Sequence, residues 1–213
     1  MIADAEATRT ATTERSVADA RRQATVDQIL VSAMRLVMDR GLDVTMDEIA
    51  EAVGVARRTL FRHFGSRERL LAGAYDAAIE RYGEQLPVFE PDWRSWLRSL
   101  CAAAHRMQAA YGPGYWQLTG RADLPDEIAA VEHRRRARRA QAMNRIARKL
   151  WTEAGGEGAM PERVRAAVGA HLSPRFTAAV TVDVGQTWHV AAELADAAIT
   201  AAVEAAVADQ RGA

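Results

Sequence analysis

The stretch TMDEIAEAVGVARRTLFRHF, residues 45–64, decides the fold of this chain. Thr45 and Glu48 have the spacing of a capping box, in which each side chain bonds to the backbone N–H of the other residue. This start signal predicts a short helix over residues 46–52. Gly54 then permits a tight turn, and a second short helix is expected over residues 57–63. Two short helices joined by a glycine-containing turn form a helix-turn-helix.

The second of these helices is strongly basic, although the chain as a whole is neutral. The 213 residues carry 28 basic and 28 acidic side chains, so the formal net charge is zero. Five arginines and one histidine nonetheless lie between Val55 and Arg69, with Glu68 as the one acid. Such a local cluster indicates contact with DNA phosphates and base edges. An arginine can donate two hydrogen bonds to one guanine in the major groove.

The segment from Ile29 through Leu71 resembles the DNA-binding domain of the tetracycline-repressor (TetR) family. The resemblance rests on TMDEIA (45–50), GV (54–55), RRTLFRHF (57–64) and GSRE (65–68). It implies an N-terminal helix-turn-helix DNA-binding domain and a C-terminal helical domain for ligand binding and dimerisation.

The resemblance also implies roles for individual residues. Thr45 stands at a phosphate contact, which a helix N-terminus favours, and His63 and Arg67 stand at further phosphate contacts. Bases are read from the start of the second helix. The DNA-binding residues that we predict are Thr45, Arg57, Arg58, Thr59, Phe61, Arg62, His63 and Arg67.

Three positions depart from the family pattern. Phe61 replaces the usual Tyr, whose hydroxyl binds phosphate, so only the packing role of this position is retained. Arg67 stands where Lys is common and can still bind phosphate. Ala56 replaces the usual Ser cap, so the second helix lacks a capping hydroxyl worth ~1 kcal/mol.

The rest of the chain is predicted to be helical, because apolar residues recur at helical spacing between Gly and Pro breaks. We expect further helices over residues 22–39, 67–85, 92–111, 125–153, 161–172 and 187–209. The helix over residues 161–172 either kinks or resumes at Pro174 and continues to about Val182. The fold class is therefore all-α, with about nine helices. The domains that we predict are a flexible N-terminal arm (1–20), the helix-turn-helix domain (21–68) and the ligand-binding and dimerisation domain (69–213).

Composition and motifs argue against several other classes of protein. A lone Cys101 fits a reducing compartment, no apolar run approaches the ~20 residues that span a bilayer, and the N-terminus lacks a signal-peptide core. We expect a cytoplasmic protein with no membrane partner. The five histidines form no metal-binding pair, and a Gly-rich phosphate loop and a nucleophile elbow are missing from the sequence. We therefore expect no catalytic residue, metal or cofactor, and Cys101 as a core residue rather than a nucleophile.

The last helix is rich in small residues, which allow helices to approach closely. With the resemblance, this favours a homodimer formed through the last two helices. The alternative is that the last helix is buried within one subunit. The residues concerned are Trp188, Ala191, Ala192, Ala195, Ile199, Ala202 and Val203.

The resemblance places a small-molecule effector in the C-terminal domain. Aromatic side chains with a few polar groups suit a hydrophobic or aromatic effector, but aromatics at helical spacing are also common core residues. The candidate ligand-binding residues are Trp93, Trp96, His105, Tyr111, Trp116 and His133.

An arginine run over residues 134–139 lies in the long helix, and its apolar stripe passes through Arg135 and Arg138. These arginines either form ion pairs, with Glu132 as a partner, or supply a counter-charge for an anionic ligand.

Together these features predict a ligand-responsive transcriptional regulator. It acts as a repressor that binds an inverted-repeat operator as a homodimer and is released by a small molecule. The alternative is a helical protein-interaction module that does not bind DNA.

Replacing Phe61 by Tyr tests the predicted position of the DNA backbone. The variant restores the hydroxyl that the family usually has, so duplex affinity is expected to rise with no change in the preferred sequence. Operator and random-duplex affinities across a salt series measure this. Weaker binding by the variant would show that no phosphate lies beside residue 61.

Overall fold

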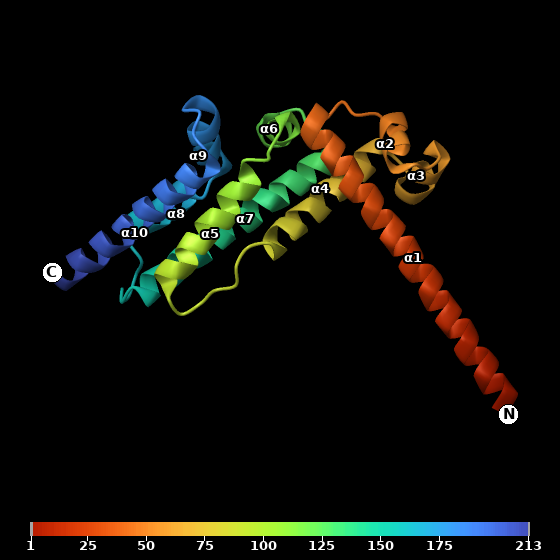
Figure 1. Ribbon diagram of the computed structural model, residues 1–213, viewed down its shortest axis with the longest axis horizontal. Helices are drawn as coiled ribbons and strands as arrows, with labels where there is room; N and C mark the ends of the chain where they lie inside the picture. The colour runs from red at the N-terminus through yellow and green to blue at the C-terminus, as the bar shows by residue number, and fades with distance from the viewer. Residues whose placement is uncertain (1, 213) are drawn as a thin grey trace. The chain divides into compact units, whose positions relative to one another are not determined.

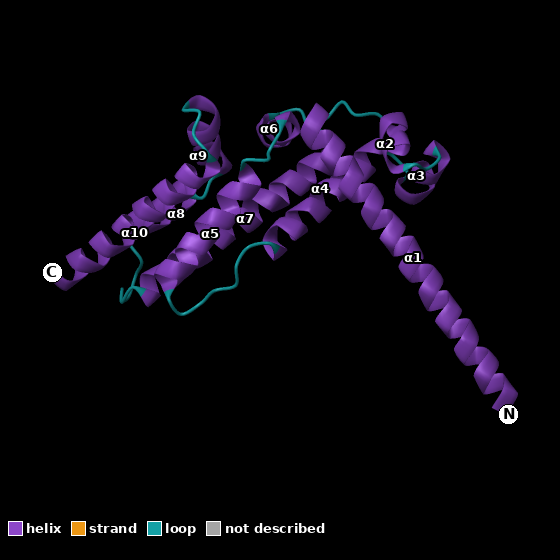
Figure 2. Cartoon of the chain, viewed as in Figure 1, coloured by secondary structure: helices purple, strands orange, loops and turns teal. Residues whose placement is uncertain are grey.

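The computed structural model describes the backbone of residues 2–212 and the side chains of residues 19–212. All regular structure within these residues is helical (Figure 2), which confirms the all-α prediction. There are ten α-helices and one π-helical turn in this part of the chain, rather than about nine helices. In chain order they are α1 (Ile2–Arg40), α2 (Met46–Val53), α3 (Arg57–Phe64), α4 (Arg67–Glu84), α5 (Trp93–Gln108), α6 (Pro113–Gly120), α7 (Asp126–Glu153), α8 (Glu162–His171), α9 (Pro174–Ala178), η1 (Ala179–Asp183) and α10 (Trp188–Gly212).

The chain forms two compact units. The first extends to Ala78 and also takes in Gly112–Val131, whereas the second contains Ile79–Tyr111 and the chain from Glu132 onward. The first unit thus contains α6 together with the N-terminal helices, although α6 lies far from them in the sequence. The functional division at residue 68 stays a prediction.

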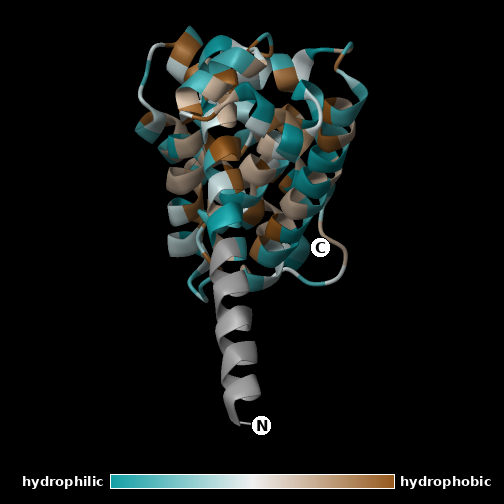
Figure 3. Cartoon of the chain, turned by 90° about the vertical axis from the view of Figure 1, so that its right-hand side faces the viewer, coloured by the Kyte–Doolittle hydropathy of each residue, from teal (hydrophilic) through white to brown (hydrophobic). Residues whose placement is uncertain are grey.

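The first unit is built on apolar side chains from four helices. Ile29 of α1, Ile49 of α2, Leu60 of α3 and Leu70 of α4 are fully buried. Burying one such side chain contributes about 1.5–3 kcal/mol, so these residues hold the short helices α2 and α3 against α1 and α4. Along the helices in Figure 3, hydrophobic positions alternate with hydrophilic ones, as expected for amphipathic helices.

The first helix begins earlier than we predicted. We expected a flexible arm over residues 1–20 and a helix from about Arg22, whereas α1 begins at Ile2. The segment contains no Gly or Pro and is rich in alanine, which has the highest helix propensity. The expected start was therefore wrong, while the flexibility of the segment stays a prediction.

A second correction concerns the Gly112-Pro113-Gly114 sequence, which we took as a break alone. In the structure Gly112 caps α6 and Pro113 occupies its first turn. A helix start suits proline, because the N–H that proline lacks has no partner within the helix there.

The two glycines also let α6 pack directly on the end of α1 (Figure 1). A Cβ atom on Gly114 would lie 1.8 Å from the Val37 carbonyl oxygen, and one on Gly112 would lie 2.2 Å from that of Met38. Only glycine fits at both positions, so the backbone of α6 lies in direct contact with the backbone of α1.

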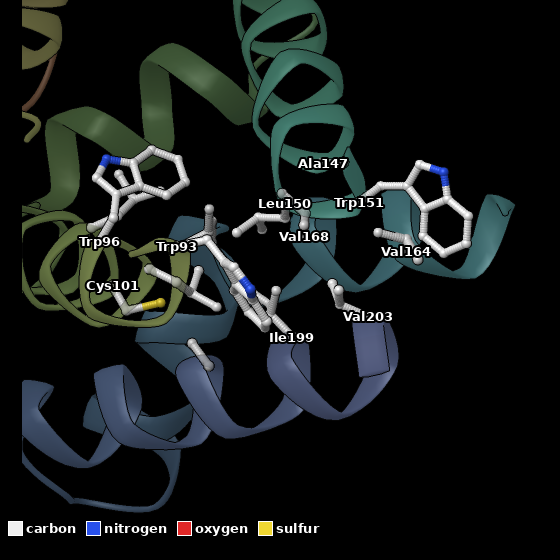
Figure 4. Close-up of a cluster of buried hydrophobic side chains, with 14 of the residues drawn as sticks. Trp93, Trp96, Cys101, Ala147, Leu150, Trp151, Val164, Val168, Ile199 and Val203 are labelled. Carbon is white, nitrogen blue, oxygen red and sulfur yellow. The ribbon is translucent and has the colours of Figure 1, made fainter. Parts of the chain in front are cut away.

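The second unit has its own apolar core, formed by α5, α7, α8 and α10. Figure 4 shows side chains from these helices directed into a common interior, among them Trp93, Leu150, Val168 and Ile199. Cys101 is fully buried in this cluster, and burial raises the pKa of its thiol to about 12. Its interpretation as a core residue is confirmed.

The small residues of α10 belong largely to this core. Ala191, Ala195, Ile199 and Val203 are fully buried against α5 and α8, so the packing within one subunit accounts for them. Using these residues as evidence for a dimer was therefore wrong. The side of α10 that remains exposed carries Leu194, Ala197, Ala201 and Ala205.

Among the described residues, no helix is both long and apolar enough to cross a membrane.

Replacing Gly114 by Ala tests the packing of α6 on α1. The added methyl group must displace α6, so the free energy of unfolding is expected to fall by about 1–3 kcal/mol. Gly120→Ala is the matched control, because a Cβ there meets nothing within 4 Å. Thermal unfolding followed by circular dichroism measures both variants. Equal melting temperatures for Gly114→Ala and the wild type would show that the close approach does not exist.

Candidate nucleic-acid interface

The start of α2 is fixed by the capping box that the sequence predicted. The Glu48 N–H donates to Thr45 Oγ1 at 3.2 Å, and the Thr45 N–H donates to Glu48 Oε2 at 2.7 Å. The bond from the Thr45 backbone holds the pKa of the Glu48 carboxyl below its usual value, so this carboxylate stays charged at neutral pH. Thr45 itself is exposed at the helix N-terminus, where its predicted phosphate contact is sterically open.

The turn between α2 and α3 depends on Gly54. Its φ of 73° and ψ of 31° lie in the left-handed region, which glycine adopts at low cost. The Val55 N–H then donates to the Ala50 carbonyl at 3.0 Å and closes the end of α2. At the start of α3, Ala56 makes no side-chain cap, as its residue type predicted.

The outer face of α3 gathers most of the predicted DNA-binding residues. Leu60 is buried and anchors the helix, while Thr59 is half-buried. Phe61 is 40% exposed, which is unusual for a large apolar side chain. The exposed members of the predicted set on this helix are Arg57, Arg58, Phe61, Arg62 and His63.

Arg57 is oriented by two neighbours. Its Nη1 donates to Asp47 Oδ2 at 2.9 Å, and its guanidinium carbon lies 5.4 Å from the centre of the Phe61 ring. The ion pair is exposed, with 57% and 66% of the two side chains accessible. Such a pair contributes about 0–1 kcal/mol, so an incoming base or phosphate can displace Asp47 at little cost.

Arg67 has a structural role that the sequence did not reveal. Its Nε donates to the Val44 carbonyl at 2.6 Å, and its Nη2 donates to the Leu42 carbonyl. The side chain is 26% exposed and also pairs with Glu68 at 3.3 Å. The guanidinium therefore holds the turn between α1 and α2, and its contact with phosphate stays a prediction.

The six candidate ligand-binding residues do not share one environment. Trp93 and Trp96 lie in the core of the second unit, and His133 is exposed on α7. Trp116 belongs to α6 in the first unit, where its ring stacks edge-on with Tyr115 at 5.1 Å. Tyr111 is half-buried just after α5.

His105 is the sixth candidate, and it belongs to a buried polar network. Its Nδ1 lies 2.8 Å from Thr177 Oγ1, and the Thr177 hydroxyl donates to Gln108 Oε1 at 2.6 Å. Because the hydroxyl proton is used by Gln108, Nδ1 of His105 must be the donor to Thr177. Burial lowers the pKa of His105 to about 4, so the ring is neutral at physiological pH.

A hollow of about 590 Å³ lies between α7 and the start of α8. It is lined by other residues, among them Asn144, Arg148 and Arg165, and by none of the six candidates. The assignment of those six to an effector site thus stays a prediction.

The arginine run on α7 includes ion pairs. Arg135 donates to both carboxylate oxygens of Glu132, at 2.6 and 2.9 Å, and Arg136 donates to Oε1 at 2.7 Å. Glu132 is buried and Arg135 is half-buried, while Arg138 is exposed. The predicted pairing with Glu132 is confirmed, and of the two arginines on the apolar stripe Arg135 is the one turned inward.

Comparison with known proteins agrees with this geometry. Residues 29–74 match the family model described as bacterial regulatory proteins, tetR family. The chain is 28% identical over 192 residues to the HTH-type transcriptional regulator TcmR of Streptomyces glaucescens. The matched stretch covers 86% of this chain and 81% of TcmR. The chain is 38% identical over 115 residues to an uncharacterized HTH-type transcriptional regulator, MT1294, of Mycobacterium tuberculosis, which covers 51% of this chain and 56% of that protein.

The chain belongs to the TetR family of bacterial regulatory proteins. Its fold is shared with a TetR transcription regulator from Haloarcula marismortui, with a TM-score of 0.64 and 15% identity over 87% of this chain and 99% of that one. The chain spans 32% to 56% of the length of curated relatives that it matches over shorter stretches. The TetR-family segment contains α2, α3 and the start of α4, so it includes every predicted DNA-binding residue.

Two residues near this surface were missed from the sequence. Asp47 was not singled out, although an acid in the first turn of α2 and a basic α3 together signal an ion pair. Gln117 of α6 could not be recognised from any local sequence pattern, because its contact with Leu42 joins residues 75 positions apart.

Replacing Arg67 by Lys separates its two roles. Lys keeps the positive charge but lacks the planar guanidinium group, whose several N–H donors can reach two carbonyls at once. If holding the turn dominates, Arg67→Lys and Arg67→Ala are expected to weaken duplex binding alike, by about three- to tenfold for the lost hydrogen bonds. Duplex affinity measured across a salt series makes the comparison, with Arg69→Lys as a control in the same turn of α4. Wild-type affinity for Arg67→Lys, with loss only in Arg67→Ala, would show that charge alone matters.

Proposed function

We propose that this TetR-family chain is a ligand-responsive transcriptional regulator that binds DNA as a homodimer and acts as a repressor. One observation carries the proposal: a chain with zero net charge exposes three arginines and a histidine on one eight-residue helix, α3. An exposed concentration of positive charge on the second helix of a helix-turn-helix suits contact with a polyanion such as DNA.

The proposed division of labour follows the geometry of α2 and α3. Arg57, Arg58 and Thr59 lie at the start of α3 and contact base edges in the major groove. Thr45 and His63 lie at the two ends of the motif and contact phosphates on either side. A helix-turn-helix places the N-terminal residues of its second helix at the bases in this way.

The proposed homodimer uses the faces of α8 and α10 that remain exposed. On α10 this face carries Leu194, 50% exposed, followed by Ala197, Ala201 and Ala205 at intervals of three and four residues. A stripe of small side chains lets two helices approach closely. Two copies related by a two-fold axis present two α3 helices to an inverted repeat, with half-sites about 34 Å or a multiple apart.

The proposed effector is a hydrophobic or aromatic small molecule bound by the C-terminal domain. To release DNA, it must bind the form with low DNA affinity more tightly than the other form, because equal affinity shifts no equilibrium. Coupling of this kind is typically ~1–3 kcal/mol.

Duplex selection followed by binding across a salt series tests the proposal. The wild type is expected to enrich an inverted repeat, and its affinity is expected to fall steeply between about 50 and 200 mM salt. Arg58→Ala should cost about 1–3 kcal/mol and relax the preference at one operator position.

Arg175→Ala is the matched control, because it removes an exposed arginine from α9 in the second unit. It is expected to bind like the wild type. If no duplex is bound with salt sensitivity, or if the two arginine variants behave alike, the chain does not bind DNA through α3 and the alternative of a protein-interaction module is favoured.

A further inference from the structure

The turn that joins α1 to α2, residues 41–45, is held by side chains from two distant helices. Arg67 of α4 donates to two carbonyls of the turn, those of Leu42 and Val44. One donor of the turn is the Leu42 N–H, which lies beyond the end of α1. Gln117 of α6 satisfies it, with Oε1 at 2.7 Å from the amide nitrogen.

This hydrogen bond is shielded from water. Leu42 is 5% exposed and Gln117 is half-buried. An N–H left without an acceptor in such a place costs more than the same loss at the surface, because water cannot replace the missing partner. The turn therefore depends on an oxygen that α6 supplies.

The position of Gln117 is itself fixed by close backbone packing. Gly112 and Gly114 set α6 against the carbonyl end of α1, as described above. On the other side, Gly41 has a φ of 95°, and a Cβ there would lie 2.7 Å from the amide oxygen and nitrogen of Gln117. Gly41 thus makes the turn and also leaves the space that the Gln117 side chain fills.

We propose that Gln117 is a positioning residue for DNA binding. Thr45, the cap of α2 and the predicted phosphate contact, follows Leu42 by only three residues, and Arg67 contacts the same turn. Displacement of the turn shifts the N-terminus of α2. It leaves unchanged the side chains of α3 that are proposed to contact bases. Gln117 lies outside the segment 29–74 that matches the family, so the DNA-binding part of this chain includes α6. The inference rests on the proposed function.

The experiment compares three substitutions at residue 117. Gln117→Met keeps the length of the side chain without an oxygen acceptor, Gln117→Ala removes the acceptor without adding an apolar group, and Gln117→Glu keeps an acceptor. The matched control is Gln141→Met, at an exposed glutamine of α7. Each variant is measured at a temperature at which circular dichroism shows wild-type helix content.

Two readouts are combined. The Leu42 amide of ¹⁵N-labelled protein should exchange with solvent faster in the Met and Ala variants and stay protected in the Glu variant. Affinity for the selected operator and for a random duplex should fall together, by about three- to tenfold, in the Met and Ala variants. The Glu variant should bind more tightly than the Met variant despite its added negative charge, and Gln141→Met should match the wild type.

The outcomes separate this inference from the proposed function. If the wild type binds DNA but the Met and Ala variants bind equally well while their Leu42 amide exchanges faster, the turn is freed without consequence and the inference is overturned. An unchanged Leu42 exchange rate in these variants overturns it as well, since the hydrogen bond is then absent. A wild type that binds no duplex overturns the proposed function first.

Discussion

The polar backbone of residues 41–45 is the constraint on which the DNA-binding part of the structure depends. A chain that leaves α1 and enters α2 within so few residues exposes N–H and carbonyl groups that neither helix can pair. Arg67 donates to two of the carbonyls, Gln117 accepts from one N–H, and the capping box pairs the N–H groups of Thr45 and Glu48 at the start of α2. Once the turn is closed in this way, α2 has one direction, and Gly54 and the buried Leu60 then fix α3 relative to it.

The charge distribution follows a second constraint. A neutral protein that is to contact DNA must collect its positive charge locally, yet an isolated cluster of arginines repels itself. Asp47 reduces this repulsion through an exposed ion pair with Arg57, and the Phe61 ring lies close to the same guanidinium. The pair is weak enough to be exchanged. The arginines of α7 are used differently, since Arg135 and Arg136 neutralise the buried Glu132 within the second unit.

Features that depend on short sequence spacing were predictable. The capping box, the left-handed Gly54, the uncapped Ala56 and the burial of Cys101 follow from residue type and local pattern, and the structure has all of them. Features that depend on tertiary packing were not. The role of Arg67 requires contacts across 23 and 25 residues, and α6 was hidden because Gly-Pro-Gly is also the signature of a loop. Helical spacing predicted the last helix and its wealth of small residues was evident, but the sequence could not decide whether those residues face the same subunit or a second one.

The central claim is that α3 and the start of α2 form the surface that meets DNA. Titrating ¹⁵N-labelled protein with a short duplex at low salt tests it most directly, because non-specific binding suffices and no operator sequence is needed. The account predicts that the largest shifts occur in the backbone amides of residues 45–48 and 57–63, while the indole resonances of the buried Trp93 and Trp151 stay unchanged. Shifts centred on α8 and α10, or no shifts at any duplex concentration, would contradict it.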